Sequence, residues 1–218
     1  MRFRLFRLII VSGLCLVSLP LSAVPRGVHS HSQANTPRRF TLDYTQSTFI
    51  AHAQRGGLLW FKGHEHLVAA RVFTGHAVLA PNQLSSSSLQ LTVKTDSMEE
   101  TSDAFTDAQK KIINGELRDI VLEPAKYPEI VFKSTRVSGK SIAANQYDLR
   151  IRGDLTLHGV TRQIDIPTKV TVNGNDLRAV GEFNIDRGDF NVKATSAFHG
   201  LVRVRRTVKF TFDIVGHE

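Results

Sequence analysis

Apolar and polar residues alternate along most of the chain after residue 40. In four segments nearly every second residue is apolar: 89–94, 149–158, 163–172 and 207–214. Successive side chains of a β-strand point to opposite faces, so each segment has one apolar and one wet face. Strands of a parallel sheet are buried on both faces. The alternation therefore predicts antiparallel strands.

We expect eight to ten strands, near 39–44, 47–53, 57–63, 67–80, 87–96, 129–138, 146–158, 162–173, 177–187 and 200–216. Turn-forming pairs separate several of them, namely Pro81-Asn82, Ser138-Gly139, Asn173-Gly174 and Arg187-Gly188. An Asn-Gly pair between two alternating runs is a strong hairpin signal.

The stretch at about 98–126 interrupts this pattern. Its apolar residues recur at spacings of three and four, which predicts one or two short helices, with Ser102 or Asp103 as the N-cap. A long antiparallel meander has two exposed edges, and closure into a barrel removes both. The expected fold is all-β: an extended, antiparallel, eight-stranded β-barrel with a short helical insert. Such a barrel is either filled by side chains or holds one small ligand.

The N-terminal residues are typical of an export signal. Arg2, Arg4 and Arg7 precede an apolar run that ends in small residues at Ser22 and Ala23. We predict a signal peptide at 1–23, a disordered leader at 24–39 and one domain at 40–218, in a periplasmic or secreted protein. Cleavage after Ala34 and a retained anchor stay open, although the run is short for a stable membrane span.

Charge and cysteine content narrow the function classes. Residues 1–34 hold four arginines and no acid, so their removal lowers the formal charge from +8 to +4. That balance does not favour a nucleic-acid surface. The one cysteine, Cys15, lies in the signal, so no disulfide is expected in the mature chain. No nucleophile elbow, phosphate-binding loop or dinucleotide motif is present, and we do not expect an enzyme.

Several motifs resemble one known family. They are Gly153–Arg162 (GDLTLHGVTR), Lys126–Ser134 (KYPEIVFKS), Phe183–Phe190 (FNIDRGDF) and Asp43–Ser47 (DYTQS). Over residues 40–216 the chain resembles the YceI-like family. The resemblance implies a lipocalin-like barrel that carries a polyisoprenoid or quinone-like amphiphile in an apolar tunnel, without established catalysis. The chain departs from the family's K-H-x-G-x-x-x-V-x-G-x-F pattern at Phe61–Val68, which reads FKGHEHLV.

The apolar faces supply the candidate ligand-binding residues. If one face lines a lumen, they are Trp60, Phe73, Leu91, Ile130, Phe132, Leu155, Leu157, Phe183, Ile185, Phe210 and Phe212. An ordinary packed core explains the same alternation. The head-group candidates are His158, Arg152 and Arg162. For His158 a structural role at a strand end is the alternative, and for the arginines a solvated strand face.

His64 and His66 are the candidate metal ligands, because a spacing of two residues puts both rings on one face of a strand. The leading hypothesis is a carrier that sequesters a long isoprenoid-like lipid, with no other cofactor. A metal-binding or redox-linked accessory protein and a solid-cored, protein-binding barrel are the alternatives. A hydrophobic small molecule is the expected partner, nucleic acid is not, and a homodimer stays open.

Overall fold

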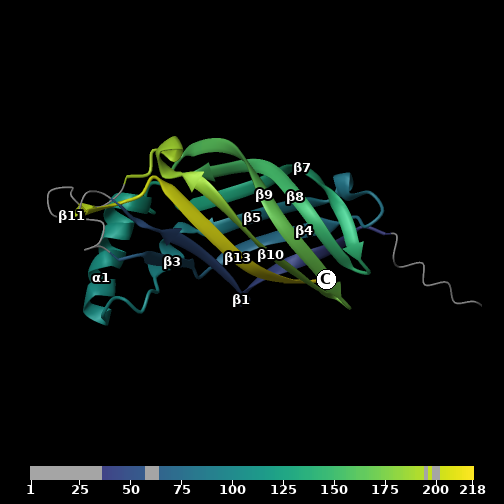
Figure 1. Ribbon diagram of the computed structural model, residues 1–218, viewed down its shortest axis with the longest axis horizontal. Coiled ribbons are helices and arrows are strands. Elements are labelled where there is room, and N and C mark those ends of the chain that lie inside the picture. Colours follow the sequence, from purple (N-terminus) through teal and green to yellow (C-terminus); the bar gives the residue numbers. More distant parts are fainter. Residues whose placement is uncertain (1–35, 57–63, 194–195, 198–201) are drawn as a thin grey trace, which may run out of the picture. The chain divides into compact units, whose positions relative to one another are not determined.

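Eight antiparallel strands close into a barrel (Figure 1). Their order around the wall is β13, β10, β9, β8, β7, β5, β4 and β1, and β1 pairs again with β13. This closure confirms the predicted all-β, eight-stranded antiparallel barrel. The structure, a computed structural model, describes residues 36–56, 64–193, 196–197 and 202–218. The predicted signal peptide, residues 24–35 of the predicted leader and the predicted strand 57–63 lie outside the described residues.

The eight barrel strands are β1 (Arg38–Ala53), β4 (Phe73–Leu79), β5 (Ser88–Lys94), β7 (Glu129–Ala143), β8 (Gln146–Leu157), β9 (Val160–Asn173), β10 (Asp176–Asp186) and β13 (Thr207–His217). Five short strands complete the set: β2 (Arg55–Gly56), β3 (His66–Ala70), β6 (Met98–Glu100), β11 (Ser196–Ala197) and β12 (Val202–Val204). β3 pairs with β1 and carries β6 on its other edge, while β2, β12 and β11 form a separate small sheet. Short 3-10 helices are η3 (Leu84–Ser86), η4 (Thr95–Ser97) and η6 (Arg187–Phe190).

The inner and outer faces follow the alternation of the sequence. In β8 the apolar side chains of Leu149, Ile151 and Leu155 are buried, while Arg150, Arg152 and Asp154 are exposed. The predicted Asn173-Gly174 hairpin joins β9 to β10, with Asn173 paired to Asp176. Burial of the apolar face supplies most of the driving force for folding, at about 25 cal/mol per Å² removed from water.

Two of the predicted strands are one strand, β1. Its pairing with β13 shifts between Asp43 and Thr48, so a bulge replaces the expected break at residues 45–46. At the bulge the hydroxyl of Ser47 donates to the carbonyl of Asp43 and accepts the Val215 N–H at 2.9 Å. The bulge therefore bends β1 without opening the seam to β13.

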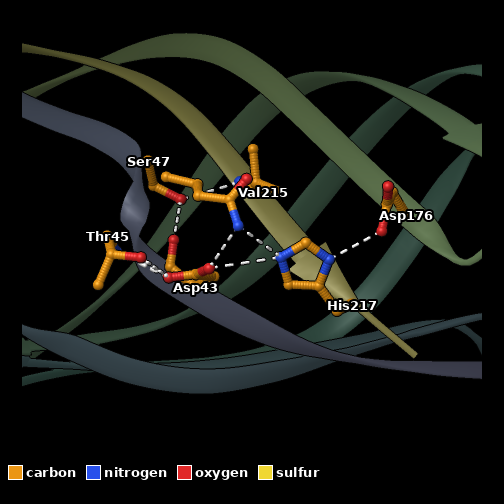
Figure 2. A network of polar contacts seen from close by, with 7 residues as sticks. Asp43, Thr45, Ser47, Asp176, Val215 and His217 are labelled. Carbon is orange, nitrogen blue, oxygen red and sulfur yellow. Dashed lines mark hydrogen bonds and ion pairs between the residues drawn. The ribbon is translucent and has the colours of Figure 1, made fainter.

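His217 bridges the same seam (Figure 2). Its Nδ1 lies 2.8 Å from Asp176 on β10, and its Nε2 lies 3.4 Å from Asp43 on β1. The hydrogen bond to Asp176, with a smaller contribution from Asp43, raises the pKa of His217. Hydrogen bonds from the Thr45 hydroxyl and N–H lower the pKa of Asp43 to about 2. The three strands that meet here are thus joined by charged groups as well as by backbone pairing.

The predicted helical insert begins later than expected, because Met98–Glu100 form strand β6. One α-helix follows, α1 (Asp107–Glu116), and it continues into a π-helix, η5 (Leu117–Leu122). Its N-cap is Thr106, which forms a capping box with Gln109, so Ser102 and Asp103 were wrong as caps. No helix of the described residues is long and apolar enough to cross a membrane.

The predicted turn at Ser138-Gly139 is wrong, because β7 runs on to Ala143 and pairs with β8 throughout. Gly139 lies opposite Leu149 with φ +151°. A Cβ at this position would lie 2.2 Å from the carbonyl oxygen of Asp148. The glycine therefore marks a close approach of two strands and not a change of direction.

Candidate functional site: a cavity inside the barrel

The barrel interior is hollow. It holds a cavity of about 260 Å³, larger than the apolar cavities of ~150 Å³ that take up benzene. All eight barrel strands contribute lining residues, and so do α1 and η5. Apart from seven polar residues the lining is apolar. The polar ones are His66, Ser87, Ser88, Glu116, Thr168, Arg187 and Lys193.

The cavity is long for its volume. Along β8 alone its lining runs from Leu149 to Leu157. At ~3.3 Å per residue that stretch of strand measures about 26 Å, or about 20 Å along the barrel axis for a strand tilt of ~40°. A volume this small over such a length describes a narrow lumen. Its dimensions suit an extended chain better than a compact molecule.

Charged lining residues lie at one end of the lumen. Glu116 is the last residue of α1, and His66 begins β3 beside the end of β1. Arg187 and Lys193 follow the end of β10, where Asp186 pairs with Thr207. Figure 1 shows α1, β3 and the end of β10 at this same end of the barrel. We call it the α1 end. The opposite end, at the β7–β8 and β9–β10 hairpins, is lined mainly by apolar residues such as Leu149 and Val170, together with the uncharged Thr168, which pairs with Leu149.

The candidates for the lumen mostly lie where the sequence places them. Eight of them line the cavity: Ile130, Phe132, Leu155, Leu157, Phe183, Ile185, Phe210 and Phe212. Phe183 and Phe210 stack at 5.0 Å between ring centres. Phe73 is buried against the ring of Tyr44, and Leu91 packs against the core, but neither lines the cavity. Trp60 lies outside the described residues.

His158 lies in the turn between β8 and β9 and does not line the cavity. It and Gly159 both have positive φ, +53° and +74°, as a type I′ hairpin requires. Its Nε2 lies 2.7 Å from the carboxylate of Glu123, and its ring packs on Tyr127 at 4.0 Å. The Nδ1 atom is buried and has no partner among the described residues. The contacts are those of a structural residue that fixes the end of η5 to the barrel, which is the alternative that the sequence left open for His158.

Arg152 and Arg162 are also away from the lumen. Arg152 forms a bidentate pair with Asp165 of the neighbouring strand, with both N–O distances at 3.0 Å. The pair lies on the outer face of the wall and raises the pKa of Arg152. Arg162 is exposed and donates to the carbonyl of Thr161 at 3.3 Å. Neither arginine lines the cavity.

The two candidate metal ligands lie against one aromatic ring. His66 stacks on Phe105 at 5.0 Å, and His64 meets the same ring edge-on at 5.5 Å. Nδ1 of His66 lies 2.7 Å from the buried carboxylate of Glu100. Burial raises the pKa of Glu100, but hydrogen bonds from His66 and from the N–H groups of Ser102 and Leu67 outweigh it and lower the pKa overall. Within the described ranges no three potential ligands are grouped as a metal would need.

Two groups of lining residues were missed. The α1 end of the lumen is covered by three residues of the insert, Ile113, Leu117 and Val121. Their spacing of four residues predicted a helix, but it did not indicate which part of the protein the apolar face of that helix would contact. Arg187 and Lys193 lie near a predicted turn, and a turn residue carries no periodic signal. Arg187 and Lys193 reach the cavity because the chain folds back toward the lumen after β10.

The comparisons with known proteins agree with this architecture. The family model described as the YceI-like domain matches residues 40–216. This chain belongs to the YceI-like family. A UPF0312 protein of Vibrio parahaemolyticus is 29% identical over 157 residues, which cover 69% of this chain and 77% of that protein. Family membership and the closed barrel thus confirm the resemblance read from the motifs.

Two solved structures share the fold. BcnA of Burkholderia cenocepacia superposes with a TM-score of 0.62 at 21% identity, over 80% of this chain and 98% of that one. A polyisoprenoid binding domain from Saccharophagus degradans superposes with a TM-score of 0.56 at 16% identity, over 82% and 97%. At these identities the likeness concerns the fold.

Proposed function

We propose that this protein binds and sequesters a long apolar chain, of isoprenoid type, inside its barrel. The observation that carries the proposal is the narrow, apolar lumen of about 260 Å³. Support also comes from the structural neighbour in Saccharophagus degradans, which is described as a polyisoprenoid binding domain.

The lumen gives such a ligand its binding energy through burial. Transfer of apolar area from water to protein gains about 25 cal/mol per Å², and the cost of ordering a flexible chain offsets part of the gain. Lining aromatics such as Phe132, Phe183 and Phe210 add large contact areas with little loss of their own side-chain freedom. The polar end of the ligand lies at the α1 end, because the charged lining residues are there.

We place this function in binding rather than catalysis, and outside the cytoplasm, where the N-terminal signal directs the chain. A carrier in that compartment keeps an insoluble lipid in solution between the places where it is made and used. The apolar lining suits this role, because it offers the chain contacts and no chemistry.

The test is the content of the native protein. Protein purified gently from its own periplasm, without detergent, is extracted with organic solvent, and the extract is analysed by mass spectrometry. We expect one long apolar amphiphile at close to one molecule per protein. A barrel that arrives empty and takes up no prenyl alcohol afterwards contradicts the proposal.

A further inference from the structure

The barrel wall has a wedge between two neighbouring strands. β9 and β10 pair from Asn173–Asp176 only as far as Thr168–Gly181. Beyond that point β9 still pairs with β8 up to Val160, and β10 still pairs with β13 up to Asp186. The two strands therefore separate toward the α1 end, and their backbone groups no longer close the wall there.

The segment after β10, residues 187–193, fills this wedge. The 3-10 helix η6 contacts β9, and Phe190 and Val192 are almost completely buried, with exposures of 2% and 8%. The segment also turns inward, because Arg187, Val192 and Lys193 line the cavity. It is therefore the place where the lumen, the wedge and two cationic side chains meet.

Arg187 is held in place by carbonyl groups. Its Nη1 donates to the carbonyl of Val192 at 2.8 Å, and its Nε donates to that of Arg205 at 3.3 Å. Its pKa is lowered, chiefly by burial and also by Arg206, against the opposing effect of Asp186. Asp186 is itself occupied, since it accepts from Arg206 at 3.1 Å and from the Gly188 N–H at 2.8 Å. Arg187 is thus a half-buried cation whose positive charge is incompletely balanced.

The other charged groups near the α1 end do not remove this excess. Within the described residues no carboxylate forms an ion pair with Arg187 or Lys193. Glu116 lines the cavity, but it belongs to α1 and is exposed. Asp189 lies on η6 and is exposed. Glu100 is occupied by His66 and two backbone N–H groups.

We propose that Arg187 and Lys193 form an anion site that receives the head group of the bound amphiphile, a phosphate or a carboxylate. This inference rests on the proposed function, because it requires the apolar chain to occupy the lumen. Beyond its two bonds to carbonyl groups, the guanidinium of Arg187 keeps the N–H groups of Nη2 and one of Nη1 for the oxygens of either anion, and the lysine adds a mobile charge. The head group lies at the wedge beside η6 and is held by residues other than His158 and Arg152.

The experiment compares ligands that share one tail. Binding of geranylgeraniol, geranylgeranyl monophosphate and inorganic phosphate is measured by calorimetry on the delipidated full-length mature protein. Hydrogen bonds between charged groups predict that the monophosphate binds about tenfold to a hundredfold more tightly than the alcohol. The preference falls with added salt, because the mouth of the lumen is open to water.

Variants locate the effect. R187Q and K193Q each reduce the preference for the monophosphate over the alcohol, and the double variant abolishes that preference. K169Q, which removes a lysine from the outer face of β9, leaves the preference intact. If R187Q disturbs the fold, K193Q still tests the proposal, because Lys193 is exposed and forms no described hydrogen bond.

The outcomes separate the two proposals. If the alcohol and the monophosphate bind equally tightly, or the double variant keeps the preference, the anion site is refuted and the apolar lumen stands. If inorganic phosphate binds as tightly as the monophosphate, the site serves a free anion and the head-group assignment is refuted. If none of the three binds, the proposed function fails and takes this inference with it.

Discussion

A tryptophan at position 179 is expected to block the lumen. Ala179 lies on β10, lines the cavity and packs against the core. The next residue, Val180, has its side chain on the outer face of the same strand and is 43% exposed. The variants A179W and V180W therefore add the same side chain to the same strand, one inside the barrel and one outside.

The size of the effect follows from the area that the new ring covers. A tryptophan buries roughly 150–250 Å², which becomes unavailable to the ligand. At about 25 cal/mol per Å² that area corresponds to about 4–6 kcal/mol of lost binding before the other contributions are counted. Since a shorter bound segment also costs less to order, we expect a net loss of about 2–4 kcal/mol. This range corresponds to a Kd about 30-fold to 1,000-fold higher.

The assay is titration of delipidated protein with geranylgeraniol, accompanied by urea denaturation of the empty forms. A179W should bind much more weakly than V180W, which should match the wild type. In a solidly packed barrel the same insertion would cost about 1–3 kcal/mol of stability or more, but in a hollow one we expect a change below about 1 kcal/mol. Equal binding by both variants, or severe destabilisation of A179W alone, would refute the hollow lumen.

Three further predictions concern the wall. The pKa of His217 is raised in the folded protein, so its stabilising contribution is complete below its ordinary value of 6.5 and is lost as the pH rises through the folded value. In urea titrations from about pH 5.5 to about pH 8.5, the stability gap between wild type and H217Q should therefore narrow, and a constant gap would contradict it. G153A places a Cβ 2.5 Å from the ring of Phe132 and should lower the free energy of unfolding by about 1–3 kcal/mol. An unchanged urea midpoint would contradict this, because it would show that neighbouring atoms move aside at little cost. H158A removes the partner of Glu123 and should cost about 1–3 kcal/mol with little change in prenyl alcohol binding, whereas a selective loss of binding would show a direct ligand role.

The period-two pattern predicted the barrel because it is imposed by the wall itself. A residue such as Leu155 must be apolar because its side chain points into the barrel. The residues next to it in the sequence must be polar because their side chains point to the solvent. The same rule places Arg152 outside, since it alternates with Ile151 and Gly153. Its position just before the Gly153–Arg162 motif, on one side of His158, had made it a head-group candidate, but strand parity opposes that role, and the pair with Asp165 accounts for the residue.

The α1 end was the least predictable part. His158 is needed where two successive positive φ angles turn the chain, and its contact with Glu123 depends on where η5 ends. Lys193 and Arg187 reach the lumen only because β9 and β10 separate. The point at which two strands stop pairing cannot be predicted from the alternation of apolar and polar residues. Local patterns therefore predicted the wall, whereas the mouth depends on contacts between distant segments.

The most direct measurement is the position of a bound chain. A crystal of the delipidated protein is grown with a fatty acid that carries bromine at its methyl end, and the anomalous signal of the bromine is located. The proposed binding mode predicts one peak inside the barrel beside Leu149 and Val170, at the end of the lumen opposite α1. A peak on the outer wall, or at the α1 end with the interior empty, would contradict it.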